Sequence, residues 1–184
     1  YVKQFRNFFY KKNYESIRVK YLKHSDYYHV ETLKEFWKDE LEEYLETSYI
    51  IKEETYDNND TLPTAHVIVT DTGSQKVIEL KTIINEGLVY TLSTAYNALY
   101  PRSKFISTFF ESFTPTTDVL LGKKITVSNA PMFFSDLASG DSLSIKRAIN
   151  LRNRITFTKD HVDSMIYYID NFEFPDGDKE ETTP

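Results

Sequence analysis

The amino-acid sequence predicts an α+β fold, in which an antiparallel sheet with a β-meander packs against two amphipathic helices and a C-terminal all-α appendage follows. Three consecutive segments between residues 64 and 95 alternate apolar and polar side chains, which is the period of a strand. Two other segments repeat apolar residues every three or four positions, which is the period of an amphipathic helix. After Pro115 only short helical patterns follow, so we expect the sheet to end before that residue.

The first two predicted elements are a helix and a strand. Residues 2–11 carry Val2, Phe5, Phe8 and Phe9, and this spacing predicts a helix. Alternation over residues 14–22 predicts a strand, with apolar or aromatic side chains on one face and basic ones on the other: Ile17, Val19 and Tyr21 against Arg18 and Lys20.

A long amphipathic helix is predicted next. Thr32 and Glu35 fit a capping box, in which each side chain accepts a hydrogen bond from the backbone of the other residue. The apolar stripe that follows consists of Leu33, Phe36, Trp37, Leu41, Tyr44 and Leu45. Trp37 lies in the middle of this stripe, so we interpret it as a core residue.

Four strands are predicted between residues 49 and 95. The first covers residues 49–56, and the meander covers residues 64–70, 76–84 and 88–95. Gly87 is expected to allow a positive φ in the last turn. The alternation predicts one buried face and one wetter face, with Glu79 and Lys81 pointing outward.

Helices are predicted for the rest of the chain. A Phe-rich helix begins near Ser103 and ends at Pro115. Short helices are expected at residues 130–138, 142–151 and 159–172, with Asn129, Asp141 and Thr158 as N-caps. We therefore expect an α+β sandwich domain over 1–115, a helical region over 116–172 that begins a longer helical array, and an acidic disordered tail over 173–184.

Composition limits the possible functions. The 184 residues carry a net charge of −6, which argues against a general nucleic-acid binder, and the absence of Cys excludes disulfides and thiolate metal sites. Charge is uneven: residues 1–24 carry seven basic side chains and one acid, a net +6, whereas residues 31–60 carry eleven acids and three bases, a net −8. We expect these two blocks to lie against each other. No apolar run is long enough for a transmembrane segment.

The high aromatic content of 15% has two explanations. The one we prefer is a genome rich in A and T, which favours Phe and Tyr codons, and the other is an aromatic binding face. The chain begins at Tyr1 rather than Met and ends in a polar segment. We therefore expect a piece of a longer protein, bacterial and associated with the cell envelope, periplasmic or anchored there.

The search for chemistry yields few candidates. With 5 Gly in the chain, neither a dinucleotide fingerprint nor a P-loop can be written, and no cofactor is expected. His24, Asp26 and His29 form the one local cluster with metal-ligand chemistry, but we interpret them as solvated loop residues. His66 has no obvious partner in the sequence and is interpreted as a surface residue.

The predicted last strand, Leu88–Ala95, is followed by Phe105–Phe113, a helix that ends in Phe-Phe-Glu-Ser-Phe. Together with the order of the elements, this stretch resembles the PsbP/Mog1-like α/β sandwich, and the resemblance covers residues 14–113. It implies an interaction or accessory module, because that group includes photosystem and nuclear-transport accessory proteins. It transfers no catalytic residues.

Three functions remain open. The first and favoured is a non-catalytic binding or assembly module, most simply for a protein partner and with a small ligand as the alternative. The second is a hydrolase that uses His66 or His29 with nearby carboxylates. The third is a helical scaffold segment at the C-terminus, which further helices would complete.

Overall fold

The computed structural model describes residues 2–10, 15–42, 45, 48–115 and 122–171. The chain divides into two compact units. The sheet unit comprises Tyr1–Asp26 and Val30–Val127, and the helical unit comprises Tyr27–His29 and Ser128–Pro184. The expected acidic tail, residues 173–184, lies outside the described residues. None of the described helices is long and apolar enough to cross a membrane.

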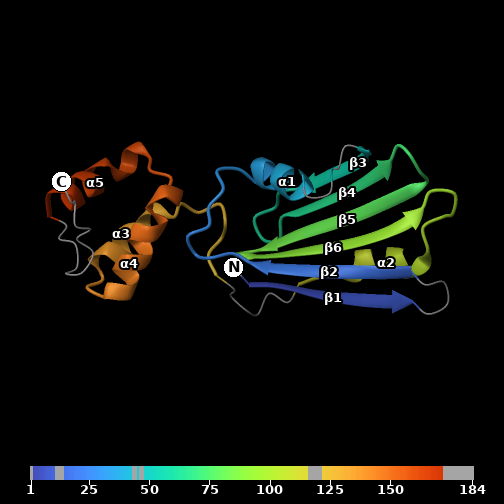
Figure 1. Cartoon of the computed structure of the whole chain (residues 1–184), viewed down its shortest axis with the longest axis horizontal. Coiled ribbons are helices and arrows are strands. Elements are labelled where there is room, and N and C mark those ends of the chain that lie inside the picture. The colour runs from blue at the N-terminus through green and yellow to red at the C-terminus, as the bar shows by residue number, and fades with distance from the viewer. Residues whose placement is uncertain (1, 11–14, 43–44, 46–47, 116–121, 172–184) are drawn as a thin grey trace, which may run out of the picture. The chain divides into compact units, whose positions relative to one another are not determined.

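The sheet unit contains six antiparallel strands in the order β1-β2-β6-β5-β4-β3, so that β1 and β3 form its two edges (Figure 1). The α+β class with its meander is confirmed. The strands are β1 (Val2–Tyr10), β2 (Glu15–Lys23), β3 (Tyr49–Asp57), β4 (Thr64–Asp71), β5 (Lys76–Asn85) and β6 (Leu88–Asn97).

The prediction of a helix over residues 2–11 is wrong. Residues 2–10 form strand β1, which pairs with β2 along its whole length, from Val2 opposite Lys23 to Tyr10 opposite Glu15. Aromatic residues favour strands, and β1 carries them on both faces, so their spacing imitates a helical period. The backbone of β2 supplies the hydrogen-bond partners of β1, and the spacing of residues within 2–10 cannot predict this pairing.

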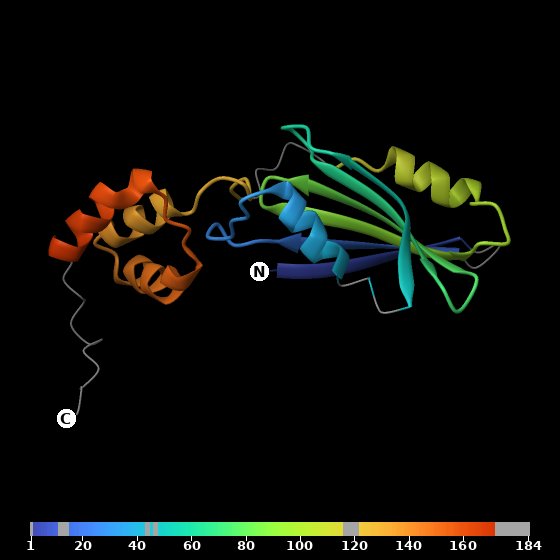
Figure 2. The ribbon, with the colours of Figure 1, turned by 90° about the horizontal axis from the view of Figure 1, so that it is seen from above.

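The two helices of this unit cover opposite faces of the sheet (Figure 2). They are α1 (Leu33–Glu42) and α2 (Lys104–Ser112). The expectation of one wetter face is therefore corrected, because each face is covered by a helix. Under α2 the core consists of Ile17, Val19, Leu92, Ile106 and Phe110.

Local signals fix the starts of both helices. The capping box of α1 is confirmed: the Glu35 amide donates to Thr32 Oγ1 over 3.2 Å, and the Thr32 amide donates to Glu35 Oε2 over 3.3 Å. Ser103 caps α2 by accepting a hydrogen bond from the Ile106 amide. Trp37 is buried, as predicted, and its indole nitrogen donates to Asn58 Oδ1 over 3.1 Å.

The β5–β6 turn uses a different residue from the one expected. Asn85 and Leu88 are paired, and between them Glu86, not Gly87, adopts a positive φ of 56°. An L-residue in this region is strained, because its Cβ approaches the neighbouring carbonyl.

The helical unit contains α3 (Ala130–Ala138), α4 (Ser142–Leu151) and α5 (Val162–Asn171), with 3₁₀ turns at Arg152–Arg154 and Lys159–His161. Asp141 caps α4 as predicted, by accepting from the Ser144 amide. Asn129 does not cap α3 through its side chain, which instead donates to the carbonyls of Tyr27 and Arg154. A capping residue can be predicted from its neighbours in the sequence, whereas the carbonyls of Tyr27 and Arg154 come close to Asn129 only when the chain folds.

Candidate functional site

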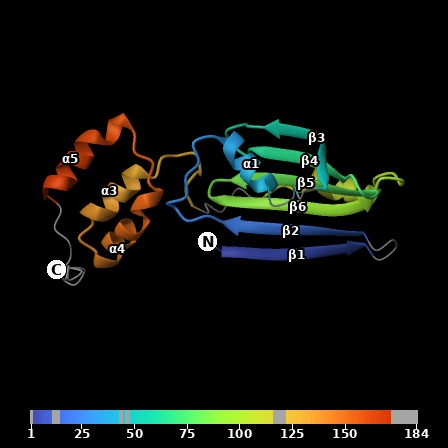
Figure 3. The same cartoon turned by 45° about the horizontal axis from the view of Figure 1, so that its top comes forward.

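The most unusual surface of the sheet unit is the aromatic edge, which we define as Phe5, Phe8, Phe9 and Tyr10 of β1. All four side chains are exposed, and Phe9 has the largest exposed fraction, 71%. Exposed aromatic residues gathered in one place mark interaction sites more often than isolated ones do. The strand that carries them is an edge strand, seen at the border of the sheet in Figure 3.

Half of the aromatic edge packs onto α2. The rings of Phe8 and Phe109 lie 5.0 Å apart, and the ring of Tyr10 stacks on Phe105 at 5.3 Å. These centroid distances are typical of attractive aromatic pairs. From Phe109 a series of ring contacts continues along α2 and across the sheet through Phe113, Tyr90 and Tyr21.

The other half lies on the α1 face of the sheet. There the guanidinium carbon of Arg18 lies 6.0 Å from the centre of the Phe5 ring, and Arg18 Nε donates to Asn7 Oδ1 over 3.2 Å. Phe9 lies on the same face, four residues beyond Phe5 along β1. A molecule bound along β1 would therefore meet aromatic side chains above and below the plane of the sheet.

The backbone of β1 adds a second feature to this site. Among the described residues, β1 pairs with β2 and with no other strand, so β1 forms one border of the sheet. Such an edge is a template for another strand, and natural proteins normally keep it short or interrupt it. Here it is nine residues long, and the strand carries basic but no acidic residues.

A buried ion-pair cluster lies under α2. Arg102 binds Glu79 through two hydrogen bonds, from Nε to Oε2 over 2.8 Å and from Nη2 to Oε1 over 2.6 Å. His66 Nε2 lies 2.9 Å from the same Oε1. The predictions of an outward Glu79 and a His66 without an obvious partner are both wrong, because α2 and the chain leading into it cover this face.

The cluster could orient His66 as a general base, because a carboxylate that holds one ring nitrogen fixes the tautomer and the ring position. The geometry also fits a structural role. Both Glu79 oxygens already accept from Arg102, and the His66 ring packs against Phe110 with centroids 6.3 Å apart. Lys81, on the same face, donates to the Phe110 carbonyl over 2.6 Å and so ties the sheet to α2.

The residues considered for metal binding, His24, Asp26 and His29, belong to two different units. His24 and Asp26 belong to the sheet unit, and His29 belongs to the helical unit. Across the described ranges, no three His, Asp or Glu side chains gather in a way that could hold a metal ion. Burial lowers the pKa of His24 to about 4, so this imidazole is neutral at pH 7. His29 Nδ1 is buried without a hydrogen-bond partner among the described residues.

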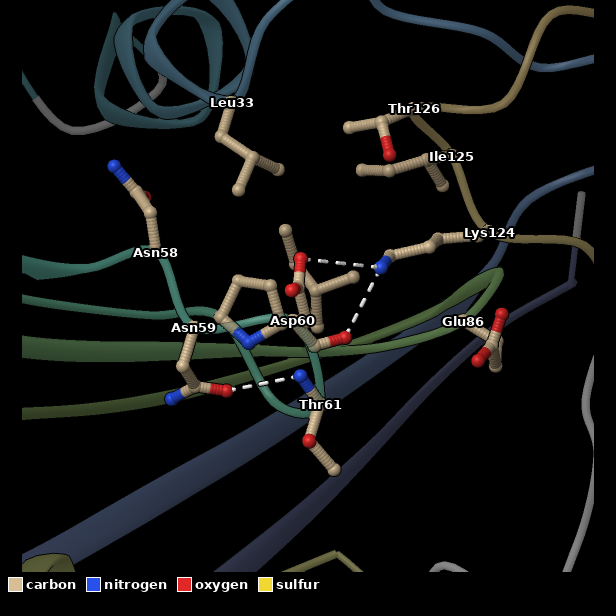
Figure 4. Close-up of a pocket in the computed structure, with 11 residues that line it drawn as sticks. Leu33, Asn58, Asn59, Asp60, Thr61, Glu86, Lys124, Ile125 and Thr126 are labelled. Atoms are coloured by element: carbon tan, nitrogen blue, oxygen red, sulfur yellow. Dashed lines mark hydrogen bonds and ion pairs between the residues drawn. The ribbon is translucent and has the colours of Figure 1, made fainter.

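A small pocket lies between the start of α1, the loop before β4, the β5–β6 turn and residues 124–126 (Figure 4). Its volume is about 70 Å³, whereas pockets for drug-sized ligands have about 300–1,000 Å³. Lys124 Nζ donates to the Asp60 carbonyl over 3.0 Å and lies 3.8 Å from the Asp60 carboxylate. The polar groups at its mouth thus bind each other, and we assign no ligand to it.

The helical unit has its own polar core. The Tyr27 hydroxyl donates to Asp136 over 2.5 Å, and Arg147 binds the same carboxylate with Nε and Nη2 at 2.7 to 2.9 Å. Burial and the Asp136 hydrogen bond raise the pKa of Tyr27 above its usual range. Because every group in this set has a partner, it reads as a structural clamp that holds residues 27–29 to the helices.

Sequence reasoning missed the aromatic edge as a site. The spacing of Phe5, Phe8 and Phe9 predicts a helix, and a helix would not present these residues along a sheet edge. One signal in the sequence could have identified the edge. Aromatic residues, which favour strands, occur at both odd and even positions of residues 2–10, so both faces of a strand would carry them.

No protein-family model matches the chain, and no curated protein sequence matches it either.

Proposed function

We propose that this protein is a non-catalytic binding or assembly module that binds an extended segment of a protein partner along β1. The observation that carries this proposal is the nine-residue strand β1, which has four exposed aromatic side chains and, among the described residues, forms one border of the sheet. In strand addition, main-chain hydrogen bonds supply affinity and alternate side chains supply specificity.

The chemistry of β1 indicates what kind of segment it binds. Lys3 and Arg6 give the strand a charge of +2 and no acid opposes them. Oppositely charged residues on neighbouring strands attract, and aromatic residues pair well with other aromatic or β-branched ones. The expected partner is therefore an extended segment that carries acidic residues together with Ile, Val, Tyr or Phe.

The test is binding of fluorescent nonapeptides that alternate acidic and apolar residues, followed by anisotropy. The variant Phe9→Ser should weaken binding about tenfold, which corresponds to roughly 1.4 kcal/mol. The matched control is Leu99→Ser, because Leu99 has the same exposed fraction as Phe9, 71%, but lies outside β1. Absence of binding, or equal loss in both variants, would refute strand addition at β1.

A hydrolase is the second candidate, favoured by the buried carboxylate that orients His66. In that case His66→Ala should abolish ester or amide hydrolysis while leaving the unfolding midpoint unchanged. His29→Ala tests the other histidine in the same assay. If the unchanged protein shows no hydrolysis and the two variants fail to fold, these histidines have a structural role.

A further inference from the structure

We propose that the segment bound at β1 is strand β3 of a second copy of this chain, so that sheets join edge to edge. This proposal rests on the proposed function, because it names the partner segment for the same edge. The two edges of the sheet have opposite charge and equal length, and their exposed side chains match in register.

The charges of the two edge strands are complementary. Strand β1 carries Lys3 and Arg6 and no acid, a charge of +2. Strand β3 also has nine residues, and it carries Glu53, Glu54 and Asp57 against Lys52, a charge of −2. Almost all of β3 is exposed, including Ile50, Ile51 and Tyr56.

The fold separates the two charged edge strands. Among the described residues, the expectation that the basic and acidic segments lie against each other is met where Lys20 Nζ lies 3.4 Å from Glu40 Oε2. The edge strands themselves lie on opposite sides of the six-stranded sheet, as Figures 1 and 3 show. The two charged strands are therefore not neighbours within one sheet.

The strand directions allow the sheet to continue. All five neighbouring pairs are antiparallel, so in a sheet of six strands β1 and β3 run in opposite directions. A second copy placed beside the first in the same orientation would therefore offer β3 to β1 as an antiparallel neighbour. This arrangement continues the existing alternation without any rearrangement.

The register of the sheet shows which side chains would meet. Residues paired across the sheet form rows, and one row runs Arg6, Val19, Leu92, Lys81, His66, Thr55. Continued into a second copy, this row places Arg6 opposite Thr55, with Glu53 and Asp57 as its diagonal neighbours. The adjacent row begins at Phe5 and ends at Tyr56, so these exposed rings would face each other. Long and aromatic side chains reach opposite and diagonal positions in a sheet.

Like charges disfavour the alternative pairings of identical edges. Two β1 strands would bring two +2 edges together, and two β3 strands would bring two −2 edges together. The β1–β3 contact is head-to-tail, so it forms an open chain of copies or a closed ring rather than a two-fold dimer.

Disulfide mapping tests this register, because the chain has no native Cys. A mixture of Phe5→Cys and Tyr56→Cys proteins should form a disulfide-linked dimer under mild oxidation, at least about tenfold faster than either protein alone. The control mixture of Phe9→Cys and Tyr56→Cys places a thiol at a more exposed position, four residues out of register. Equal rates in all samples, or crosslinking of Phe5→Cys to itself, would overturn the proposal.

Charge reversal provides a second test, by sedimentation of the folded proteins. Lys3→Glu with Arg6→Glu makes β1 negative, and Glu53→Lys with Glu54→Lys makes β3 positive. Each pair of changes alone should weaken self-association about tenfold or more, whereas all four together, or a mixture of the two proteins, should restore it. The control Lys104→Glu, an exposed charge on α2, should leave association unchanged.

These results separate the two proposals. If all proteins stay monomeric while acidic nonapeptides still bind β1, only the second copy is refuted. If neither peptides nor copies bind, strand addition at β1 falls as well. Self-association that is indifferent to both charge reversals would overturn the β1–β3 contact.

Discussion

Nε2 of His66 lies 2.9 Å from Oε1 of Glu79, although the Glu79 side chain is fully buried and the His66 side chain is 38% exposed. The two residues lie on neighbouring strands, two positions out of direct register. Arg102 completes the cluster from the segment before α2. The cluster thus joins the meander to the Phe-rich helix, and its members should differ in their effects on stability.

The first prediction concerns these differences. Arg102→Ala should lower the free energy of unfolding by about 3 kcal/mol, because it leaves the buried Glu79 carboxylate without its main partner. Glu79→Gln should cost about 2 kcal/mol, since the amide keeps the volume but loses the charge. His66→Ala should cost less than about 1 kcal/mol, because its side chain is partly in water. Urea unfolding gives the order, and a His66→Ala loss as large as that of Arg102→Ala would contradict it.

The second prediction is a pH dependence from His24. Its pKa is about 4 in the fold, lowered mainly by burial, against 6.5 as the ordinary value. Below pH 6.5 the unfolded chain takes up a proton that the folded chain does not, so this contribution to stability is lost as the pH falls from about 6.5 to 4.

Because His24 is partly exposed, solvent screening reduces the effect. We expect the free energy of unfolding to fall by about 1–2 kcal/mol between pH 6.5 and 4. The His24→Gln protein should lack this component, so the difference between the two stability–pH curves isolates it. Parallel curves would show that His24 ionises equally in both states.

A third prediction addresses the helical unit. Tyr27→Phe removes the donor to the buried Asp136 carboxylate, and hydrogen bonds to charged groups contribute about 1.5–3 kcal/mol. Melting of the helical signal should shift down accordingly. Tyr167→Phe is the control, because its side chain is exposed on α5, and it should change little. Equal effects would argue against the clamp.

The exposed stripe of α5 leads to a fourth prediction. Val162, Ile166 and Ile169 are exposed on α5, whereas Tyr168 stacks on Phe134 with ring centres 5.3 Å apart. Ile166→Ser should therefore change stability by no more than about 0.5 kcal/mol, and Tyr168→Ala should cost about 2–3 kcal/mol. A large loss for Ile166→Ser would show that this stripe is covered, which is what the helical scaffold hypothesis requires.

The fifth prediction uses the strained turn residue. Glu86→Asn should stabilise the sheet unit by about 0.5–1 kcal/mol, because Asn tolerates a positive φ better than other residues with a Cβ. Glu86→Ala keeps the strain and serves as the control. The midpoint of urea unfolding distinguishes them, and an equal midpoint for both variants would remove strain as the cause.

Strong local patterns predicted most of the fold. The capping box at Thr32, the helix start near Ser103 and the strands of the meander depend on residues that are close in sequence, and each is confirmed. The candidate site was predicted much less well. β1 was assigned to a helix, and Glu79 was expected in water, because both depend on partners far away along the chain: β2 for the first and α2 with Arg102 for the second.

The sequence by itself determined the α+β class, the positions of five of the six strands and the amphipathic helices, because periodicity and capping act over a few residues. Tertiary structure alone decided which strand lies at the edge, which carboxylate is buried, and that the basic and acidic strands lie on opposite borders of one sheet. Strand order arises from pairing between distant segments, and local spacing carries no information about it.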